Sequence, residues 1–195
     1  MNQAYCSLIH GGLAVGMLND SYIGFSPCCL INGRSDQIEV TKNDLLGKDF
    51  FNHPKLSEMR TENTNGGWRK SCEQCRYAER TTGNSFRLGS NLRFGDLTGS
   101  VGPTNLYLSM DNACNLACRT CVPAASTTWQ DIQYKSGELR SKFHLRYDHD
   151  IVTRFFDGID LSNLTNIMLM GGEPLLGNSA QRFIEYVNSR ISLSN

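Results

Sequence analysis

Residues 104–121 read TNLYLSMDNACNLACRTC, and this stretch decides the fold. Residues 104–110 form an apolar run that is typical of a buried strand. Cys114, Cys118 and Cys121 follow directly, in the spacing C-x3-C-x2-C. A structural zinc or an electron-transfer 4Fe-4S cluster normally takes four protein ligands, whereas three thiolates leave one metal position open. The sequence therefore predicts a reactive metal site immediately beyond the carboxyl end of a strand.

Beyond this stretch, the pattern predicts alternating helices and strands. A helix can begin at Pro123 and continue through Trp129 and Ile132. Residues 166–170, NIMLM, predict a strand that is apolar on both faces. Two further helices are indicated by apolar residues at helical spacing: Ile151, Val152, Phe155 and Phe156 in one, with Asp148 or Asp150 as its N-cap, and Phe183, Ile184, Val187 and Ile191 in the other. Strands apolar on both faces and separated by helices predict an α/β fold with a parallel sheet.

The segment MGGEP ends the strand at residues 166–170 and supplies the second motif. Its glycines let backbone carbonyls approach a ligand closely, and the carboxylate of Glu173 can help to accept an ammonium group. Taken alone, the segment is also explained by a simple glycine turn at the end of a strand. The cysteine array and this GGEP segment, in this order and each at a strand end, together resemble the signature of radical S-adenosylmethionine (SAM) enzymes.

The resemblance implies a partial parallel (β/α) barrel of the radical SAM type, with a 4Fe-4S cluster on Cys114, Cys118 and Cys121. It also implies that SAM chelates the open iron and that four residues orient it: Gly171, Gly172, Glu173 and Pro174. Reductive cleavage of SAM then yields a 5'-deoxyadenosyl radical that takes hydrogen from the substrate. The substrate expected from such relatives is a peptide or another macromolecule, and the expected reductant is a flavodoxin or a ferredoxin.

One position departs from the family pattern. The family often has an aromatic residue beside the adenine just before the third cysteine, where this chain has Thr120. Thr120 is therefore assigned to the cofactor site without a stacking surface. Trp129 is a candidate for that surface, although a Trp on a helix is more often a core residue.

The first part of the chain carries the other cysteines and resembles a twitch domain, a shortened auxiliary-cluster module of the SPASM-related radical SAM subgroup. The segments SPCC and WRKSCEQC carry the resemblance, together with Glu79 and CRTCVPAASTTW. We expect residues 1–99 to form this twitch-like iron-sulfur domain, small and irregular, and residues 100–195 to form the amino-terminal part of the barrel. The expected ligands of an auxiliary 4Fe-4S cluster are Cys6, Cys28, Cys72 and Cys75. Cys29 is expected to be a buried thiol, because consecutive side chains in an extended segment point to opposite sides.

Regular elements are harder to predict in this first part. Residues 7–18 and 38–40 indicate strands, and residues 54–60 indicate a short helix. Residues 81–103 contain too many Gly, Asn and Ser residues for a long element. The resulting core is thin, so a bound metal centre is expected to contribute to folding.

Zinc is the main alternative at both cysteine groups. The three-cysteine array could be a zinc knuckle completed by His144, by His149 or by a cysteine of the first part. Two distant cysteines with a C-x2-C pair also fit zinc by spacing. The sequence therefore leaves three functions open: a radical SAM enzyme, a non-catalytic iron-sulfur subunit that transfers electrons, and a zinc-stabilised binding module. Arg69, Lys70 and Arg76 could lower the cost of a reduced cluster or form a solvated basic face.

Composition limits the remaining possibilities. Nineteen basic and nineteen acidic residues give a net charge of zero, so no global field favours nucleic acid or an anionic membrane. No cationic leader and no long apolar run is present, and we expect a cytoplasmic protein. The chain after Cys114 is short for a barrel, in which each strand–helix unit takes roughly 30 residues. We therefore expect a fragment, a truncated reading frame or one half of a split enzyme whose missing strands come from another chain.

Overall fold

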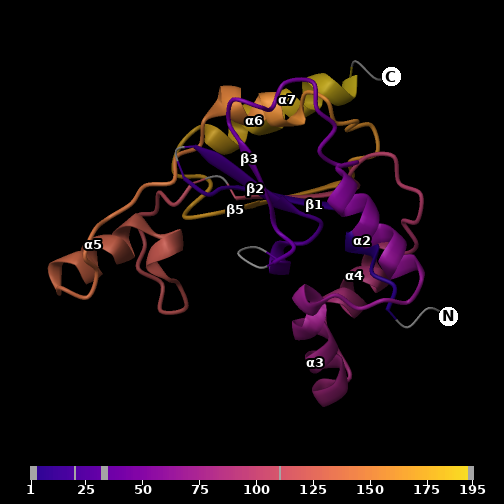
Figure 1. The fold of residues 1–195 in the computed structure, drawn as a ribbon. Helices are drawn as coiled ribbons and strands as arrows, with labels where there is room; N and C mark the ends of the chain where they lie inside the picture. The colour runs from indigo at the N-terminus through magenta and orange to yellow at the C-terminus, as the bar shows by residue number, and fades with distance from the viewer. Residues whose placement is uncertain (1–3, 20, 32–34, 110, 193–195) are drawn as a thin grey trace.

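A computed structural model describes residues 4–19, 21–31, 35–109 and 111–192. Its centre is one five-stranded sheet in the order β3-β2-β1-β4-β5 (Figure 1). The strands are β1 (Gly12–Met17), β2 (Tyr22–Ser26), β3 (Ile38–Thr41), β4 (Asn105–Ser109) and β5 (Asn166–Met170). β1, β4 and β5 run parallel, and β2 and β3 extend the sheet in antiparallel fashion. The predicted α/β class is confirmed, with a mixed open sheet.

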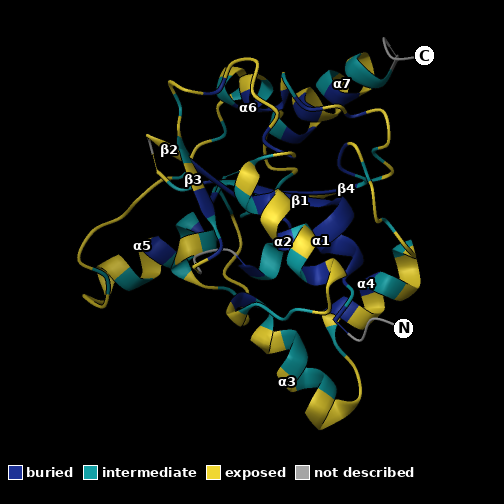
Figure 2. Cartoon of the chain, turned by 45° about the vertical axis from the view of Figure 1, so that its right-hand side comes forward, coloured by how far each residue is buried: buried dark blue, intermediate teal, exposed yellow. Residues whose placement is uncertain are grey.

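The helices lie on both sides of this sheet. They are α1 (Ser7–Gly11), α2 (Pro54–Thr64), α3 (Glu73–Thr82), α4 (Phe86–Phe94), α5 (Thr127–Lys135), α6 (His149–Phe156) and α7 (Ser179–Ser192). In Figure 1, α6 and α7 lie together above the sheet, while α1, α2 and α4 gather on its other side. Two helices, α3 and α5, project from the body and carry mostly exposed and half-buried residues (Figure 2). Both of these helices adjoin cysteine groups.

An aromatic cluster forms the core between the sheet and α6. The rings of Phe50 and Phe155 stack with centroids 4.6 Å apart, and Phe25 of β2 packs edge-on against both. Phe155 also contacts Phe156, which in turn packs against Phe183 of α7. Offset and edge-to-face pairs of this kind add stabilisation beyond area burial. The cluster joins residues from both ends of the chain.

This core crosses the predicted boundary at residue 99. The same sheet carries β1 from the first part and β4 from the second, paired in parallel from Gly12 with Asn105 to Gly16 with Ser109. The division into residues 1–99 and 100–195 stays a prediction about domains. The region before residue 99 contributes a large part of this shared core, because β1 and β2 are almost entirely buried.

Several predicted elements are found where the sequence indicates them. The strand at residues 38–40 is β3, the helix at residues 54–60 is α2 with a longer carboxyl end, and Asp148 caps α6 by accepting a hydrogen bond from the Ile151 amide. Two predictions are wrong. Residues 7–11 form α1 rather than the start of a strand, and residues 86–94 form α4 within the segment expected to lack a long element. Ser85 caps α4 through a hydrogen bond from the Leu88 amide, which outweighs the local glycine content.

The environment of β5 also differs from expectation. This strand lies at the edge of the sheet, and Met168 is 46% exposed. It was expected to be buried on both faces, but none of its five residues is buried, and Ile167 and Met168 are exposed. No helix in the described ranges is long and apolar enough to cross a membrane.

Candidate metal centres and cofactor site

The cysteine loop, residues 111–121, leaves the sheet at the carboxyl end of β4, as predicted. Cys114 and Cys121 are half-buried, Cys118 is exposed, and all three are free thiols. The Cys121 amide donates to the Cys118 carbonyl at 3.0 Å, which turns the loop between these two cysteines. The Leu116 amide lies 3.4 Å from the sulfur of Cys114. Hydrogen bonds from amides to cysteine thiolates help to set the reduction potential of an iron-sulfur centre.

The start of α5 holds this loop through four consecutive side chains, Ser126 to Trp129, which we call the STTW clasp. Ser126 donates to the Leu116 carbonyl at 3.1 Å, and Thr128 donates to the Cys114 carbonyl at 2.6 Å. Thr127 accepts from the Cys114 amide at 3.1 Å. The indole Nε1 of Trp129 donates to the Cys118 carbonyl at 2.8 Å. Side chains of one helix end therefore position the backbone of two of the three cysteines.

This finding gives Trp129 a role other than the two considered from sequence. Its indole is half-buried against the cysteine loop, so it is neither a deep core residue nor shown to be free for stacking. The predicted helix start at Pro123 corresponds to a short 3-10 turn, Pro123–Ala125, followed by α5. The sequence signal for the clasp is the run of hydroxyl residues in STTW, since such side chains readily bond nearby backbone groups.

Replacing Trp129 with phenylalanine tests the clasp. The ring keeps most of its packing but loses the hydrogen bond to the Cys118 carbonyl, so the loop should become less ordered. We expect faster loss of iron from the three-cysteine site under a chelator, by about threefold or more, because a net hydrogen bond contributes roughly 1 kcal/mol. The control is Tyr134→Phe on the exposed side of the same helix, which should leave the rate unchanged. Equal rates in wild type and Trp129→Phe would contradict a positioning role.

The GGEP segment follows β5 and docks directly against the cysteine loop. The Gly172 amide donates to the Asp111 carbonyl, and the Glu173 amide donates to the Ala113 carbonyl, both at 2.8 Å. These bonds continue the pairing of β4 with β5 beyond the strand ends. The two motifs are therefore adjacent in space as well as similarly placed at strand ends.

Both glycines are required by this close approach. A Cβ on Gly171 would lie 2.2 Å from the Asp111 carbonyl oxygen, and one on Gly172 would lie 2.1 Å from that of Ala113. Gly171 also has a φ of +130°, a conformation that side chains disfavour. The glycine turn considered from sequence therefore allows the chain after β5 to lie directly against the cysteine loop.

The remaining predicted cofactor residues occupy different surroundings. Glu173 is half-buried, and its carboxylate accepts a hydrogen bond from the Leu175 amide at 3.1 Å. Pro174 is half-buried beside it, while Thr120 is exposed on the cysteine loop. Burial raises the pKa of the Asp111 carboxyl, although the Ala113 amide opposes the change. The loop thus holds one desolvated carboxyl group at its start.

Substituting Gly172 with alanine should separate the two motifs. The added methyl meets backbone rather than a flexible side chain, so the GGEP turn must move away from Ala113. We expect SAM affinity to fall at least about tenfold, with cluster content unchanged, as measured by anaerobic equilibrium binding. Gly177→Ala, where a Cβ meets nothing within 4 Å, is the matched control. Wild-type affinity in Gly172→Ala would show that the close approach is irrelevant to the cofactor.

The four cysteines predicted to bind an auxiliary cluster line one pocket, which we call the N-terminal cysteine pocket. Cys6 enters from the chain start, Cys28 from the end of β2, and Cys72 and Cys75 from the start of α3. Their sulfurs are close enough for Cys6 to influence the ionisation of both Cys28 and Cys72. The structure thus brings together four cysteines whose sequence spacing alone could only suggest a shared site.

Buried polar side chains that sequence reasoning missed hold these cysteines in place. The side chain of Asn63 accepts from the Cys6 amide at 3.0 Å and donates to the Ala4 carbonyl at 2.6 Å. Asp36 accepts from Ser71 at 2.5 Å and from Arg69 at 3.0 Å, which fixes the turn before Cys72. Neither residue has a distinctive sequence signal, because Asn63 lies near the end of a polar helix and Asp36 lies in a polar turn.

A buried ion pair closes the same region. Arg87 donates to the Glu79 carboxylate through two nitrogens, at 2.8 and 2.5 Å, and to the Tyr5 carbonyl at 2.5 Å. Burial alone would raise the pKa of Glu79, but the hydrogen bonds from Arg87 and Ser85 hold it below its usual value. Glu79 belongs to the segment that carries the twitch resemblance, and here its partner is Arg87.

Cys28 and Cys29 differ in environment. Cys28 is buried and lines the pocket, whereas Cys29 is half-buried and is absent from the lining. The expectation that Cys29 is fully buried is wrong, because Cys29 begins a 3-10 turn rather than continuing an extended segment. The hydrogen bond between the two thiols raises the pKa of Cys28 and lowers that of Cys29 to about 7.

The four thiols of the pocket are donors of the type that zinc and iron-sulfur centres use. Burial raises the pKa of the Cys6 thiol and raises that of Cys72 to about 11. Metal ligation requires thiolates, so a bound cation would have to supply the stabilisation that the pocket lacks. Across the described ranges, no three His, Cys, Asp or Glu side chains lie close enough together to hold a single metal ion.

Of the two histidines of the zinc alternative, His144 lies on the segment before α6 and His149 is the first residue of α6. His144 shares a small pocket with Asp111 and Ala113 at the start of the cysteine loop. The ring of His149 lies 2.9 Å from the hydroxyl of Tyr147. Asn112 ties this segment to the loop, since its side chain accepts from the Leu145 amide at 3.0 Å.

Comparison with known proteins gives one distant similarity. The chain is 27% identical over 121 residues to proteins named GTP 3',8-cyclase 3 from Mycobacterium bovis and Mycobacterium tuberculosis. The match covers 61% of this chain but only 29% of those relatives. No family model matches the chain, and no solved structure matches it. This similarity supports a relationship to enzymes of the radical SAM class.

Proposed function

We propose that this chain is a radical SAM protein whose cysteine loop holds a 4Fe-4S cluster and whose GGEP turn orients SAM. The observation that carries the proposal is the pair of 2.8 Å hydrogen bonds that dock Gly172 and Glu173 against the cysteine loop. They bring a three-thiol array and a glycine-rich carboxylate turn to one edge of a parallel pair of strands. The distant similarity to GTP 3',8-cyclases supports the same assignment.

Each motif has a separate role in this proposal. Cys114, Cys118 and Cys121 hold iron as thiolates and leave one iron position for the amino and carboxylate groups of SAM. Glu173 and the backbone of the two preceding glycines bind the SAM ammonium. The bound cluster and SAM supply one-electron cleavage and radical chemistry, while the protein binds and orients them. The STTW clasp keeps the loop in one conformation.

Anaerobic reconstitution with iron and sulfide tests this function. The reduced protein should show an EPR signal that changes on addition of SAM, and 5'-deoxyadenosine should accumulate with a reductant such as dithionite. Clusters that respond to SAM in neither assay would favour a non-catalytic electron carrier. Bound zinc without acid-labile sulfide would favour a binding module and would overturn the proposal.

The N-terminal cysteine pocket is proposed to hold an auxiliary 4Fe-4S cluster on Cys6, Cys28, Cys72 and Cys75. Support comes from the convergence of these thiols, and from two groups that pin the surrounding backbone, Asn63 and Asp36. Such a cluster, with four protein ligands, could relay electrons to the SAM-binding cluster from a flavodoxin or ferredoxin. We place it in a twitch-like unit formed by residues 1–99.

Serine substitutions at the adjacent cysteines test the ligand assignment. Cys28→Ser should remove the auxiliary cluster and about half of the bound iron, because it replaces a pocket-lining thiolate with a hydroxyl. Cys29→Ser is the matched control and should retain all of the iron, because Cys29 lies outside the pocket lining. The reverse result, measured by iron and sulfide content, would assign Cys29 as the ligand.

Two substrate classes are proposed. A peptide or another macromolecule follows from the twitch and SPASM resemblance, and a purine nucleoside triphosphate follows from the name of the cyclase relatives. Hydrogen transfer from deuterated candidate substrates into 5'-deoxyadenosine distinguishes them, because only the true substrate delivers deuterium to the radical.

A further inference from the structure

A second and larger cavity, of about 900 Å³, lies beside the N-terminal cysteine pocket. It opens between α3, α4 and the segment after α4, and we call it the arginine pocket. Its walls combine three guanidinium groups with an aromatic ring and small polar side chains: Arg76, Arg80, Arg87, Trp68, Asn91 and Thr98. The volume lies within the range of small-molecule sites. None of these side chains belongs to the SAM site described above, and Trp68 and Arg87 also line the N-terminal cysteine pocket.

Two of the guanidinium groups are available to a ligand. Arg76 and Arg80 are four residues apart on α3, so they lie on the same helix face, and both line the pocket. The Arg76 side chain is 41% exposed, and its one ion pair with a described residue is a long contact of 3.7 Å with Glu73. No ion pair of Arg80 is found among the described residues. Like charges at this spacing weaken a helix slightly, and an anion between them would reverse that effect.

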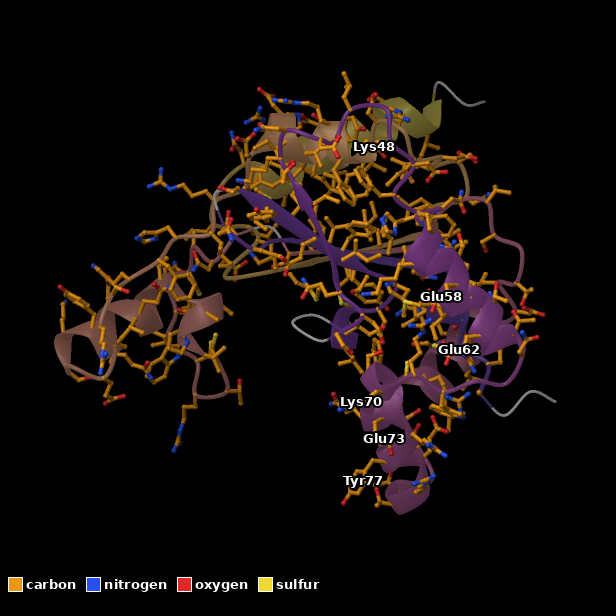
Figure 3. All side chains as sticks on the ribbon, viewed as in Figure 1. Lys48, Glu58, Glu62, Lys70, Glu73 and Tyr77 are labelled. Atoms are coloured by element: carbon orange, nitrogen blue, oxygen red, sulfur yellow. The ribbon has the colours of Figure 1, made fainter. Side chains whose placement is uncertain are left out.

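The negative groups of the pocket do not cancel this charge. Glu79 is paired with the buried Arg87, so that pair contributes little net charge. Asp96 is exposed and bonded to the Thr98 amide at 2.9 Å. Figure 3 labels Lys70 on the 3-10 turn before α3, and Glu73 and Tyr77 on α3; none of the three is part of the pocket lining. The lining therefore presents two arginines against one exposed carboxylate, that of Asp96.

Trp68 forms a wall shared by the arginine pocket and the N-terminal cysteine pocket. The Arg87 guanidinium lies 4.8 Å from the centre of its ring, and that of Arg76 lies 5.8 Å away. Arg76 is exposed enough to move aside, and a planar group could then stack on the indole. Arginine guanidinium groups bind phosphate oxygens, and an aromatic ring beside them can stack on the base of a nucleotide.

We propose that the arginine pocket binds a phosphate-bearing ligand, with Arg76 and Arg80 holding the phosphate oxygens. The ligand would lie against Trp68, on the far side of that ring from the N-terminal cysteines. The shared chemistry has two sources, a free di- or triphosphate and a nucleotide. This site is separate from the SAM site, because its lining shares no residue with the cysteine loop or the GGEP turn.

Isothermal titration calorimetry on the intact chain, kept anaerobic, tests the proposal with pyrophosphate and with ATP. We expect saturable binding of one equivalent, and a loss of about tenfold or more in affinity in Arg80→Gln, because charge-assisted hydrogen bonds are lost. Arg140→Gln replaces an exposed arginine far along the chain and should bind like the wild type. Both arginine positions are exposed, so neither change should disturb folding.

Trp68→Leu separates the two sources. A larger loss for ATP than for pyrophosphate assigns a nucleotide that stacks on the indole, whereas equal affinity for both in the wild type assigns a free polyphosphate. Absence of saturable heat with either probe would overturn the proposal. Binding that is equally strong in Arg80→Gln and Arg140→Gln would also overturn it, because the phosphate would then bind elsewhere.

Discussion

Reconstituted Cys118→Ala protein is expected to hold about four iron atoms in place of about eight, with no EPR response to SAM. Cys118 is exposed on the cysteine loop, so its loss should not disturb the core. Two remaining thiolates cannot retain the cluster, and no 5'-deoxyadenosine should form. Iron and acid-labile sulfide analysis, with EPR before and after SAM addition, measures the result.

The complementary control is Cys75→Ala. Cys75 lines the N-terminal cysteine pocket, so this variant should lose the other half of the iron and keep the SAM-dependent change in the EPR spectrum. If each variant lost iron equally from both sites, the assignment of two separate centres would be wrong. Full iron content in Cys118→Ala would show that the loop does not hold a cluster.

Phe155→Ala should lower the free energy of unfolding by about 3–5 kcal/mol, the range for large aromatic truncations in a core. Phe155 has no exposed surface and lies at the centre of the aromatic cluster, stacked on Phe50 and edge-on to Phe25. These partners come from the first part of the chain. Both halves should therefore lose stability together, as one transition in chemical denaturation followed by circular dichroism.

Phe143→Ala supplies the matched control for this experiment. Phe143 is 41% exposed, and its replacement should cost no more than about 1 kcal/mol. Two resolved transitions in Phe155→Ala, with only the later one shifted, would argue that residues 1–99 fold independently of the α6 core. That outcome would support the domain boundary predicted from sequence over a shared core.

The second half of the chain was the more predictable. Its strands and helices show clear periodicity, and β4, α6, β5 and α7 lie where apolar spacing places them. The capping of α6 by Asp148 was also visible, because an Asp before an apolar helical pattern is a local signal. The positions of the cysteine loop and the GGEP turn followed from their places after strands.

Contacts between residues far apart in the chain could not be predicted from the sequence. Nothing in residues 12–17 indicates that β1 pairs in parallel with β4, because pairing between distant strands leaves no local pattern. The contacts that hold the cysteines, such as Asn63 with the Cys6 amide and Trp129 with the Cys118 carbonyl, join residues with no characteristic spacing. The exposure of β5 was missed because an apolar strand reads the same at an edge and in the centre of a sheet.

The strand order has a consequence for how this architecture can grow. β4 already has hydrogen-bonded neighbours on both sides, β1 and β5, so neither of its edges can accept another strand. Additional strands can pair only at the outer edges of β3 and β5, and a closed ring that contains β4 must contain all five strands. The hairpin of β1 and β2 would therefore form part of the wall of any barrel assembled from this sheet.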